Sequence, residues 1–505
     1  MAKTETALPN DPELLKAMVL AERAESERLR QIIAALQRHR FGRRAESLPE
    51  DQLQLALEDV EQVEAAGHAE AEEKSPEERK TRAATRRRNR GALPAHLPRI
   101  ETVVDIESTV CPCCSGTLHR IGEDVSERLD IIPAQFRVLV VRRPKYACRT
   151  CEDVVVQAPA PARLIEGGMP TEATVAHILI AKYADHLPLY RQAQIYARQG
   201  VALDRSTLAD WVGRAAFLLR PVRDRLLDRL KTSTKLFADE TTCPVLDPGR
   251  GVTKTGQLFA YVRDDRPWGG GDPPGVAYVY APDRKAERPI AHLAGFRGVL
   301  QVDGYAGYKV LAEKTDVRLA YCWSHVRRRF YELAQSGPAP IASEALLRIA
   351  ALYRIEDDIR GLPPDCRRVV RQERIRPLIE ALEPWLRAKL SLISQKTKLA
   401  EAIRYALSRW AGLCLFLDDG RIEIDNNTVE RAIRPLALAR KNALFAGSDG
   451  GAEHWAVIAS LIETCKLIGV EPYAYLLDVI TRIVNGLEGK FFFPPSQPSR
   501  PSRDT

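Results

Sequence analysis

Two stretches of sequence decide the fold of this chain: residues 235–246 (KLFADETTCPVL) and residues 298–308 (GVLQVDGYAGY). In each, an apolar run of strand character leads to an acid, which is Asp239 in the first stretch and Asp303 in the second. An acid that follows a buried strand lies at the rim of a sheet, where ligand-binding side chains gather. The two stretches therefore predict a buried sheet with two carboxylates at its rim.

A third acid, Glu430, lies in a helical pattern at residues 421–442 (RIEIDNNTVERAIRPLALARKN). Three carboxylates suit a pair of magnesium or manganese ions, which such sites hold roughly 3.5–4 Å apart. Two simpler explanations stay open. The chain has 67 acids, so three of them can fall on apolar elements by chance. Asn427 and Glu430 also have the spacing of a helix capping box, in which Glu430 only returns a hydrogen bond to the cap.

The elements around the two aspartates predict the sheet itself. Strand-like runs follow at residues 257–265 and 275–281, then a helical pattern at 285–296. After Asp303 come a helical pattern at 305–314 and a short apolar run at 317–322. The order of three strands, helix, strand, helix and strand is that of an α/β ribonuclease-H-like sheet, with acids on its first and fourth strands.

Four long runs resemble the insertion-sequence-66 family of bacterial transposases, in the family's order: residues 111–152, 182–192 (KYADHLPLYRQ), 301–308 and 425–476. The resemblance implies a DDE-type transposase in which Asp239, Asp303 and Glu430 are the metal-binding acids. It implies that the enzyme nicks the ends of its element and that the freed 3′ hydroxyl attacks target DNA. The implied partners are double-stranded DNA (terminal inverted repeats and target), further copies of the chain, and small accessory proteins of the same element.

Further site residues follow from the same resemblance and from charge. The run Cys322-Trp-Ser-His325 resembles a signature of several DDE transposase families and places His325 near the scissile phosphates, although a buried structural histidine is the alternative. Basic residues follow this histidine and the predicted helix of Glu430. The candidates for contacts with DNA are Arg327, Arg328, Arg434, Arg440 and Lys441.

Two CxxC pairs predict a structural zinc ion. Cys111 and Cys114 are separated by 33 residues from Cys148 and Cys151. Each pair suits a knuckle that gives two thiolates to one tetrahedral zinc. The alternative, a redox CxxC, needs only one pair. We therefore expect a zinc ribbon at residues 99–165, and the family resemblance implies that this ribbon binds DNA.

The first 98 residues divide into a helical pattern and a highly charged segment. Residues 1–69 predict helix, with a coiled coil and a plain amphipathic helix equally open. Residues 70–98 are rich in charge and poor in large apolar side chains, which predicts a disordered linker. Its Arg86, Arg87 and Arg88 are candidates for salt-sensitive contacts with DNA, although such runs are often only solvated.

Composition sets the class of protein. The formal charge of +8 and pI near 8.9 are compatible with a polyanionic partner. There is no signal-peptide pattern and no apolar run of membrane-spanning length, so we expect no membrane contact and a cytoplasmic, nucleoid-associated protein. In that compartment the ten cysteines are not expected to form a disulfide framework.

The remaining chain divides by its apolar spacing. The predicted segments are a helix-turn-helix-like region at 166–230, a first part of the catalytic core at 231–329, an all-helical insertion at 330–418, a second part of the core at 419–490, and a disordered tail at 491–505. Two other functions stay open. A repurposed DNA-binding protein would keep the basic and zinc modules without cleavage, and a stand-alone nuclease would cut without preference for terminal repeats.

Overall fold

The computed structural model describes residues 135–147, 155–165, 168–247, 252–335 and 337–486, together with Ser75, Glu77, Lys80 and Thr81. The chain divides into two compact units, Met1–Ala134 and Gln135–Thr505. All elements named below belong to the second unit. The predicted coiled coil, the four cysteines predicted to bind zinc, the Arg86–Arg88 run and the C-terminal tail lie outside the described residues.

A few residues of the predicted linker are described, and they differ from the prediction. Glu77, Lys80 and Thr81 are helical. The Thr81 hydroxyl donates a hydrogen bond to the Glu77 carbonyl oxygen at 3.1 Å, across one helical turn. The sequence 70–98 was expected to be disordered throughout because it lacks large apolar residues, but helix needs no apolar face where charged residues with good helix propensity follow one another.

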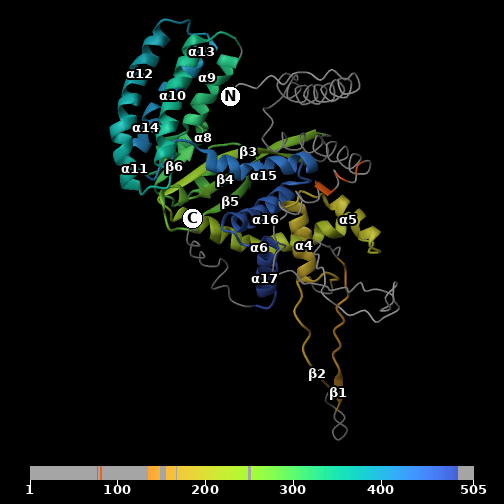
Figure 1. Ribbon diagram of the computed structural model, residues 1–505. Helices are drawn as coiled ribbons and strands as arrows, with labels where there is room; N and C mark the ends of the chain where they lie inside the picture. Colours follow the sequence, from red (N-terminus) through yellow and green to blue (C-terminus); the bar gives the residue numbers. More distant parts are fainter. Residues whose placement is uncertain are drawn as a thin grey trace, which may run out of the picture. The chain divides into compact units, whose positions relative to one another are not determined.

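A five-stranded mixed sheet forms the centre of the second unit (Figure 1). Its spatial order is β5-β4-β3-β6-β7. The first three strands pair antiparallel, whereas β6 is parallel to β3 and β7 is parallel to β6. The strands are β3 (Lys235–Asp247), β4 (Val252–Arg263), β5 (Gly275–Ala281), β6 (Val299–Val302) and β7 (Arg318–Tyr321).

The sheet forms here because these runs are apolar enough to be buried on both faces. Leu236, Phe237 and Ala238 of β3 are fully buried. Continuous burial of this kind is expected for central strands with helices on either side. The parallel pairing of β3 and β6 puts Phe237 opposite Gln301, so that Asp239 and Asp303 follow at the same level.

Helix α16 (Asp449–Leu467) covers the outer edge of the sheet at β5. The Ser460 and Thr464 hydroxyls accept hydrogen bonds from the backbone N–H groups of Tyr278 and Val276, at 2.8 and 3.1 Å. These bonds satisfy groups that an edge strand would otherwise leave open to pairing with another chain.

Helices α4 (Glu172–Tyr183), α5 (Leu189–Arg198) and α6 (Arg205–Lys231) precede the sheet. Helix α5 ends at a turn where Gly200 has φ +80°, a value that glycine adopts without strain. Helix α6 is 27 residues long and buries Trp211 and Leu226. One face of α6 is therefore packed into the core along its whole length, and its other face is exposed.

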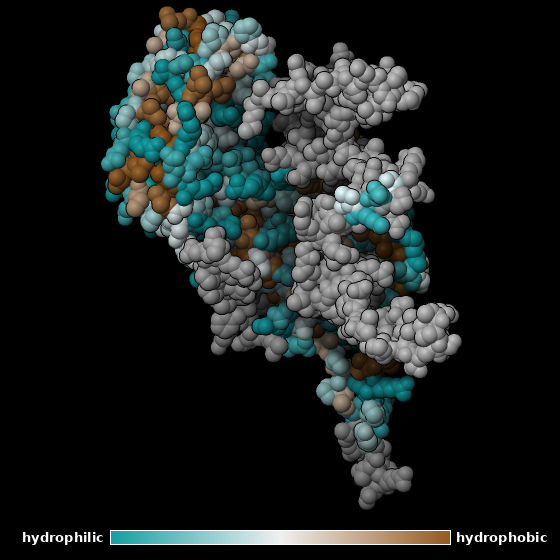
Figure 2. Space-filling model, in the orientation of Figure 1, coloured by the Kyte–Doolittle hydropathy of each residue, from teal (hydrophilic) through white to brown (hydrophobic). Residues whose placement is uncertain are grey.

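The chain between β7 and Glu430 is helical and has a hydrophobic core of its own, which includes Trp323, Phe330 and Ile349 (Figure 1). Figure 2 shows hydrophobic residues among hydrophilic ones on its surface, where Leu347 and Leu392 are 66% and 76% exposed. Its elements are α9 (Trp323–Gln335), α10 (Pro340–Asp358), α11 (Pro364–Val370), a π-helical turn (Arg371–Ile375), α12 (Arg376–Ser391), α13 (Lys398–Leu407) and α14 (Trp410–Asp418).

A buried ion network ties these helices to the chain that leads to Glu430. Arg371 bonds both oxygens of Glu356 at 2.7 Å, and Arg367 bonds Glu423 at 2.7 Å. The two arginine side chains are at most 1% exposed. Because an unpaired buried charge is costly, each partner fixes the position of the others.

The remaining elements of the second unit are the short antiparallel pair β1 (Lys145–Ala147) and β2 (Val155–Gln157), the turn η1 (Arg266–Trp268), α7 (Glu287–His292), α8 (Ala306–Lys314), α15 (Asn427–Ala443) and α17 (Pro472–Val484). Helix α15, which carries Glu430, packs against β3 and β4.

Candidate functional site

The structure brings the two predicted aspartates together. Asp239 lies in β3 and Asp303 directly follows β6, its parallel neighbour. Carboxylate oxygens of Asp239, Asp303 and Glu240 lie within 4.8 Å of one another. Glu240 is an acid that the sequence analysis did not single out, although it is adjacent to Asp239 in the run ADET. These three residues are called the acidic centre below.

Backbone and side-chain donors fix the two aspartates. The Glu240 N–H donates to Asp239 Oδ1 at 2.8 Å, and the Tyr305 N–H donates to Asp303 Oδ1 at 2.9 Å. The Tyr405 hydroxyl, from α13, donates to the carbonyl oxygen of Asp303 at 2.5 Å. The orientation of Asp303 therefore depends on the helices that follow β7.

Gly304 is needed for this contact. Its φ is +121°, which only glycine adopts readily. A Cβ here would lie 2.6 Å from Arg409 Nε and 3.1 Å from the Tyr405 hydroxyl. Arg409 also donates to the Gly304 carbonyl oxygen at 3.2 Å. The groups that approach Gly304 most closely are therefore Tyr405 and Arg409.

The acidic centre holds more negative charge than its neighbours compensate. Burial, followed by the charges of Asp303 and Glu240, raises the pKa of Asp239 to about 8. Burial and Asp303 also raise the pKa of Glu240, although Arg284 opposes them. Arg284 Nε donates to Glu240 Oε1 at 2.9 Å. Oxygen ligands with excess negative charge fit a hard divalent cation such as magnesium or manganese.

Glu430 lies in the first turn of α15, but not in a capping box. The helix begins at Asn427, and its N-cap Asn426 makes no side-chain hydrogen bond to the helix. The Asn427 side chain instead donates to Asp425 Oδ2 at 2.8 Å. The capping explanation of Glu430 is therefore wrong, because Asn427 is already helical and its amide is used elsewhere.

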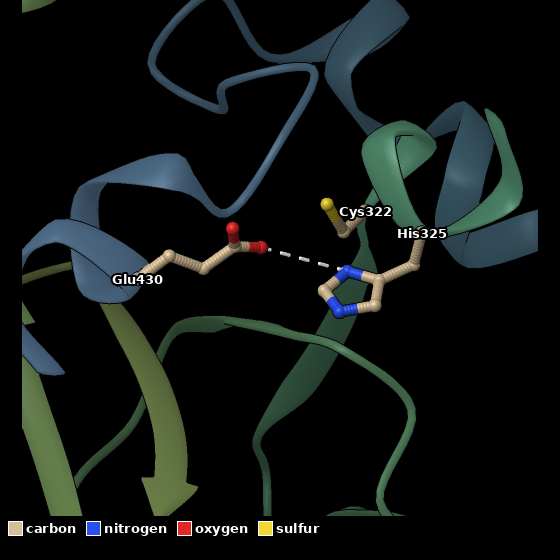
Figure 3. Close-up of side chains that lie close together, drawn as sticks. All are labelled: Cys322, His325 and Glu430. Atoms are coloured by element: carbon tan, nitrogen blue, oxygen red, sulfur yellow. Dashed lines mark ion pairs between the residues drawn. The ribbon is translucent and has the colours of Figure 1, made fainter. Parts of the chain in front are cut away.

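The Glu430 carboxylate faces His325 rather than the two aspartates. Its Oε1 lies 3.7 Å from His325 Nδ1 (Figure 3). Atoms of Cys322, His325 and Glu430 lie within 4.8 Å of one another, and they are called the mixed cluster below. Glu430 is still close enough to Asp239 for its charge to raise the pKa of that residue. It therefore lies between the two groups.

Two strands hold the start of α15 in place. The Gln301 side-chain amide of β6 donates to the carbonyl oxygens of Glu423 and Asp425, at 3.0 and 3.3 Å. The Asn426 side chain donates to the Ala238 carbonyl oxygen at 3.3 Å, and its N–H donates to Cys322 Sγ at 3.2 Å. These bonds place Glu430 beside β3 and β7 although it is distant from both in sequence.

The predicted basic contacts differ in how far they are exposed. Arg327, Arg328 and Lys441 are exposed, whereas Arg434 is partly buried. Arg328 pairs with Glu332 at 3.1 Å, one turn along α9. Arg440 donates to the Thr242 hydroxyl at 2.6 Å and to its carbonyl oxygen, so it bridges α15 and β3.

Comparison with known families decides the identity. Residues 167–454 match the model described as "Transposase IS66 family". The chain belongs to the IS66 transposase family. Other IS66 models match residues 108–152 ("zinc-finger binding domain of transposase IS66"), 28–102 ("Transposase C of IS166 homeodomain") and 460–488 ("IS66 C-terminal element"). They confirm the resemblance seen in the sequence and give this IS66 chain a zinc-binding domain.

Full-length relatives accompany these matches. "Uncharacterized protein y4jD" of Sinorhizobium fredii (strain NBRC 101917 / NGR234) is 46% identical over 95% of this chain and 94% of its own length. "Uncharacterized protein y4qI" of the same organism is 44% identical over 95% of both chains. Among the described residues of this IS66 protein, no helix is both long enough and apolar enough to cross a membrane.

Proposed function

We propose that this IS66 transposase cleaves DNA at the ends of its insertion sequence and transfers the resulting 3′ hydroxyl into target DNA. One observation carries the proposal: Asp239, within β3, and Asp303, directly after the parallel neighbour β6, meet in the acidic centre, where burial and the charges of Asp303 and Glu240 raise the pKa of Asp239. Carboxylates held this close together can bind the divalent ions that catalyse the cleavage of phosphodiester bonds.

The order of the sheet supports a ribonuclease-H-like core. Three antiparallel strands are followed by two parallel ones, and acids lie on β3 and after β6. In this proposal residues 231–329 and 419–490 form the two parts of the core, residues 330–418 are a helical insertion, and residues 166–230 form a helix-turn-helix-like region. The insertion would position Asp303 through Tyr405 and Arg409.

Asp239, Asp303 and Glu430 would hold magnesium or manganese. Glu240 adds a fourth carboxylate to this set. When bound, such ions supply Lewis-acid stabilisation to the attacking and leaving oxygens of a phosphodiester. The chain itself orients the acids: Tyr305 and Tyr405 fix Asp303, and Gln301 and Asn426 fix the start of α15. His325 would contact the scissile phosphate region.

Basic residues would bind the DNA backbone, and zinc would fold the ribbon. Cys111, Cys114, Cys148 and Cys151 are the proposed zinc ligands, in the segment that matches the zinc-finger model. Double-stranded DNA, further copies of this chain and small accessory proteins of the element are the proposed partners. The proposed phosphate contacts are Arg86, Arg87, Arg88, Arg327, Arg328, Arg434, Arg440 and Lys441.

A cleavage assay tests the reaction. Wild type and Glu430→Gln would be compared on a labelled duplex of the element's end, with magnesium and the accessory proteins present. We expect wild type to nick at the end and the variant to lose at least about 100-fold in rate. Equal cutting by both would remove Glu430 from the site. Binding without any cutting would favour a DNA-binding protein, and cutting of unrelated duplexes at the same rate would favour a nuclease.

A further inference from the structure

The mixed cluster gathers three kinds of donor atom from three elements. Cys322 follows β7, His325 lies in the first turn of α9, and Glu430 lies in the first turn of α15 (Figure 3). Their sulfur, nitrogen and oxygen atoms lie within 4.8 Å of one another. The acidic centre offers oxygen only, so the two groups differ in the cation that they prefer.

We propose that Cys322, His325 and Glu430 form a second cation site on this chain, which takes zinc or another thiophilic divalent cation. Magnesium selects oxygen ligands, whereas thiolate and imidazole together select zinc, cobalt and similar ions. Three protein ligands leave one position of a tetrahedral ion open. The side chains of His325 and Glu430 are 29% and 40% exposed, so a water molecule can reach that position.

His325 has a buried ring nitrogen that lacks a hydrogen bond. Among the described residues, no hydrogen-bond partner lies at Nδ1, and its nearest charged group is the Glu430 carboxylate at 3.7 Å. A buried polar atom without a partner is costly. A cation between Nδ1, the carboxylate and the sulfur would satisfy all three.

The sulfur of Cys322 has neighbours that suit a metal-bound thiolate, although burial raises the pKa of the free thiol to about 12. It is buried, and it accepts the Asn426 N–H at 3.2 Å. It also lies at the N-terminus of the 13-residue helix α9, whose dipole favours negative charge. Binding of the cation replaces the thiol proton, which is released to solvent.

The shared residue gives the site a regulatory consequence, which rests on the proposed function. Glu430 is needed beside Asp239 and Asp303 for cleavage, and one carboxylate cannot serve both sites at once. Zinc held by Cys322 and His325 keeps Glu430 away from the acidic centre. Zinc therefore inhibits the magnesium-dependent reaction by occupying its third acid.

Metal content tests the site itself. Full-length wild type, Cys322→Ser and the control Cys366→Ser would be loaded with zinc, desalted and analysed for zinc per chain. Cys366 is an exposed cysteine on α11. We expect wild type and Cys366→Ser to hold one equivalent more than Cys322→Ser. Equal zinc in all three proteins would overturn the proposal, because the ribbon contributes the same amount to each.

A second variant and an absorption spectrum show whether a loss of zinc results from misfolding or from loss of a ligand. Serine is a good helix N-cap and keeps an acceptor at the start of α9, so Cys322→Ser should fold. His325→Ala removes the nitrogen ligand instead and should lose the same equivalent of zinc. With cobalt in place of zinc, wild type minus Cys322→Ser should show a sulfur-to-cobalt band. Spectra that superimpose would also overturn the site.

Inhibition of cleavage by zinc separately tests whether the zinc site controls Glu430. In magnesium, added zinc should reduce end cleavage by wild type and Cys366→Ser at least about tenfold, and reduce cleavage by Cys322→Ser much less. Equal inhibition of all three would show that the zinc site, if loaded, does not control Glu430. If no protein cleaves in magnesium alone, the proposed function fails, whereas the zinc content still decides the site.

Discussion

Asp239 and Asp303 approach each other from two neighbouring parallel strands, and the charge of Asp303 helps to raise the pKa of Asp239 to about 8. Two carboxylates that repel each other destabilise the acidic centre, and a bound cation would relieve that repulsion. Evidence for the proposed reaction can therefore be sought in stability as well as in cleavage.

The raised pKa of Asp239 predicts how stability depends on pH. The folded protein holds a proton on this group up to about pH 8, whereas the unfolded chain loses it near pH 4. The free energy of unfolding should therefore fall as the pH rises from about 4 to 8. Asp239→Asn should remove this loss and be the more stable protein at pH 8, by up to about 5 kcal/mol, because each unit of pKa shift corresponds to about 1.4 kcal/mol. Thermal unfolding of both proteins at pH 5 and pH 8, in the presence of a chelator, measures this difference in stability. An Asp239→Asn variant that is less stable than wild type at pH 8 would contradict the prediction.

Gly304→Ala should weaken both stability and cleavage. The φ of +121° strains any other residue, and the new Cβ would meet Arg409 Nε at 2.6 Å. We expect a loss of about 1–3 kcal/mol in stability and a larger loss of cleavage than of DNA binding, because Asp303 moves. Gly361→Ala, also at positive φ but with open space around its Cβ, is the matched control. Equal losses for the two variants would mean that the contact with Arg409 is unimportant.

The buried ion network should be critical for the helices after β7. Arg371→Ala leaves Glu356 buried without its main partner and should cost about 3–5 kcal/mol. Arg374→Ala removes an exposed pair with Asp358, in which both side chains are more than half exposed, and should cost at most about 1 kcal/mol. Chemical denaturation of both variants compares the costs. Similar shifts in the two midpoints would refute the network's role.

Tyr405→Phe should separate positioning from binding. It removes only the hydroxyl that donates to the Asp303 carbonyl oxygen. We expect the cleavage rate to fall about tenfold, a typical cost for slight misplacement of a reacting group, with unchanged affinity for end DNA. The single-turnover cleavage rate and the DNA-binding isotherm, measured on the same variant, distinguish a positioning role of Tyr405 from a DNA contact. A fall in affinity with an unchanged rate would instead make Tyr405 a DNA contact.

Much of the sheet could be predicted from sequence because each strand contains an apolar run, although β3 continues for eight residues beyond Asp239, which the apolar run did not indicate. Because β3 and β6 pair in parallel with Phe237 opposite Gln301, Asp239 and Asp303 lie side by side, each two residues further along its chain. The bonds from Tyr405 and Arg409 could not be predicted, because they depend on how helices more than 100 residues away in sequence pack against β6. Glu240 was missed because alternation along a strand predicts that neighbouring side chains point apart.

The position of Glu430 shows the same limit. Its helix was predicted, but the capping pattern of Asn427 gave the wrong local explanation. Its proximity to Cys322 and His325 is set by the bonds of Gln301 and Asn426, which join segments more than 100 residues apart. Which of the two groups of ligands the Glu430 side chain joins can be determined only once that packing is known.

Binding of Mn²⁺, measured together with cleavage, tests whether the acidic centre is the metal site of this transposase. Full-length wild type, Asp303→Asn and the control Asp316→Asn, an exposed acid before β7, would be titrated with Mn²⁺ and assayed for end cleavage in the same buffer. We expect Asp303→Asn to bind Mn²⁺ at least about tenfold more weakly and not to cleave, while Asp316→Asn behaves as wild type. Cleavage and Mn²⁺ affinity that survive in Asp303→Asn would show that the acidic centre is not the metal site of this transposase.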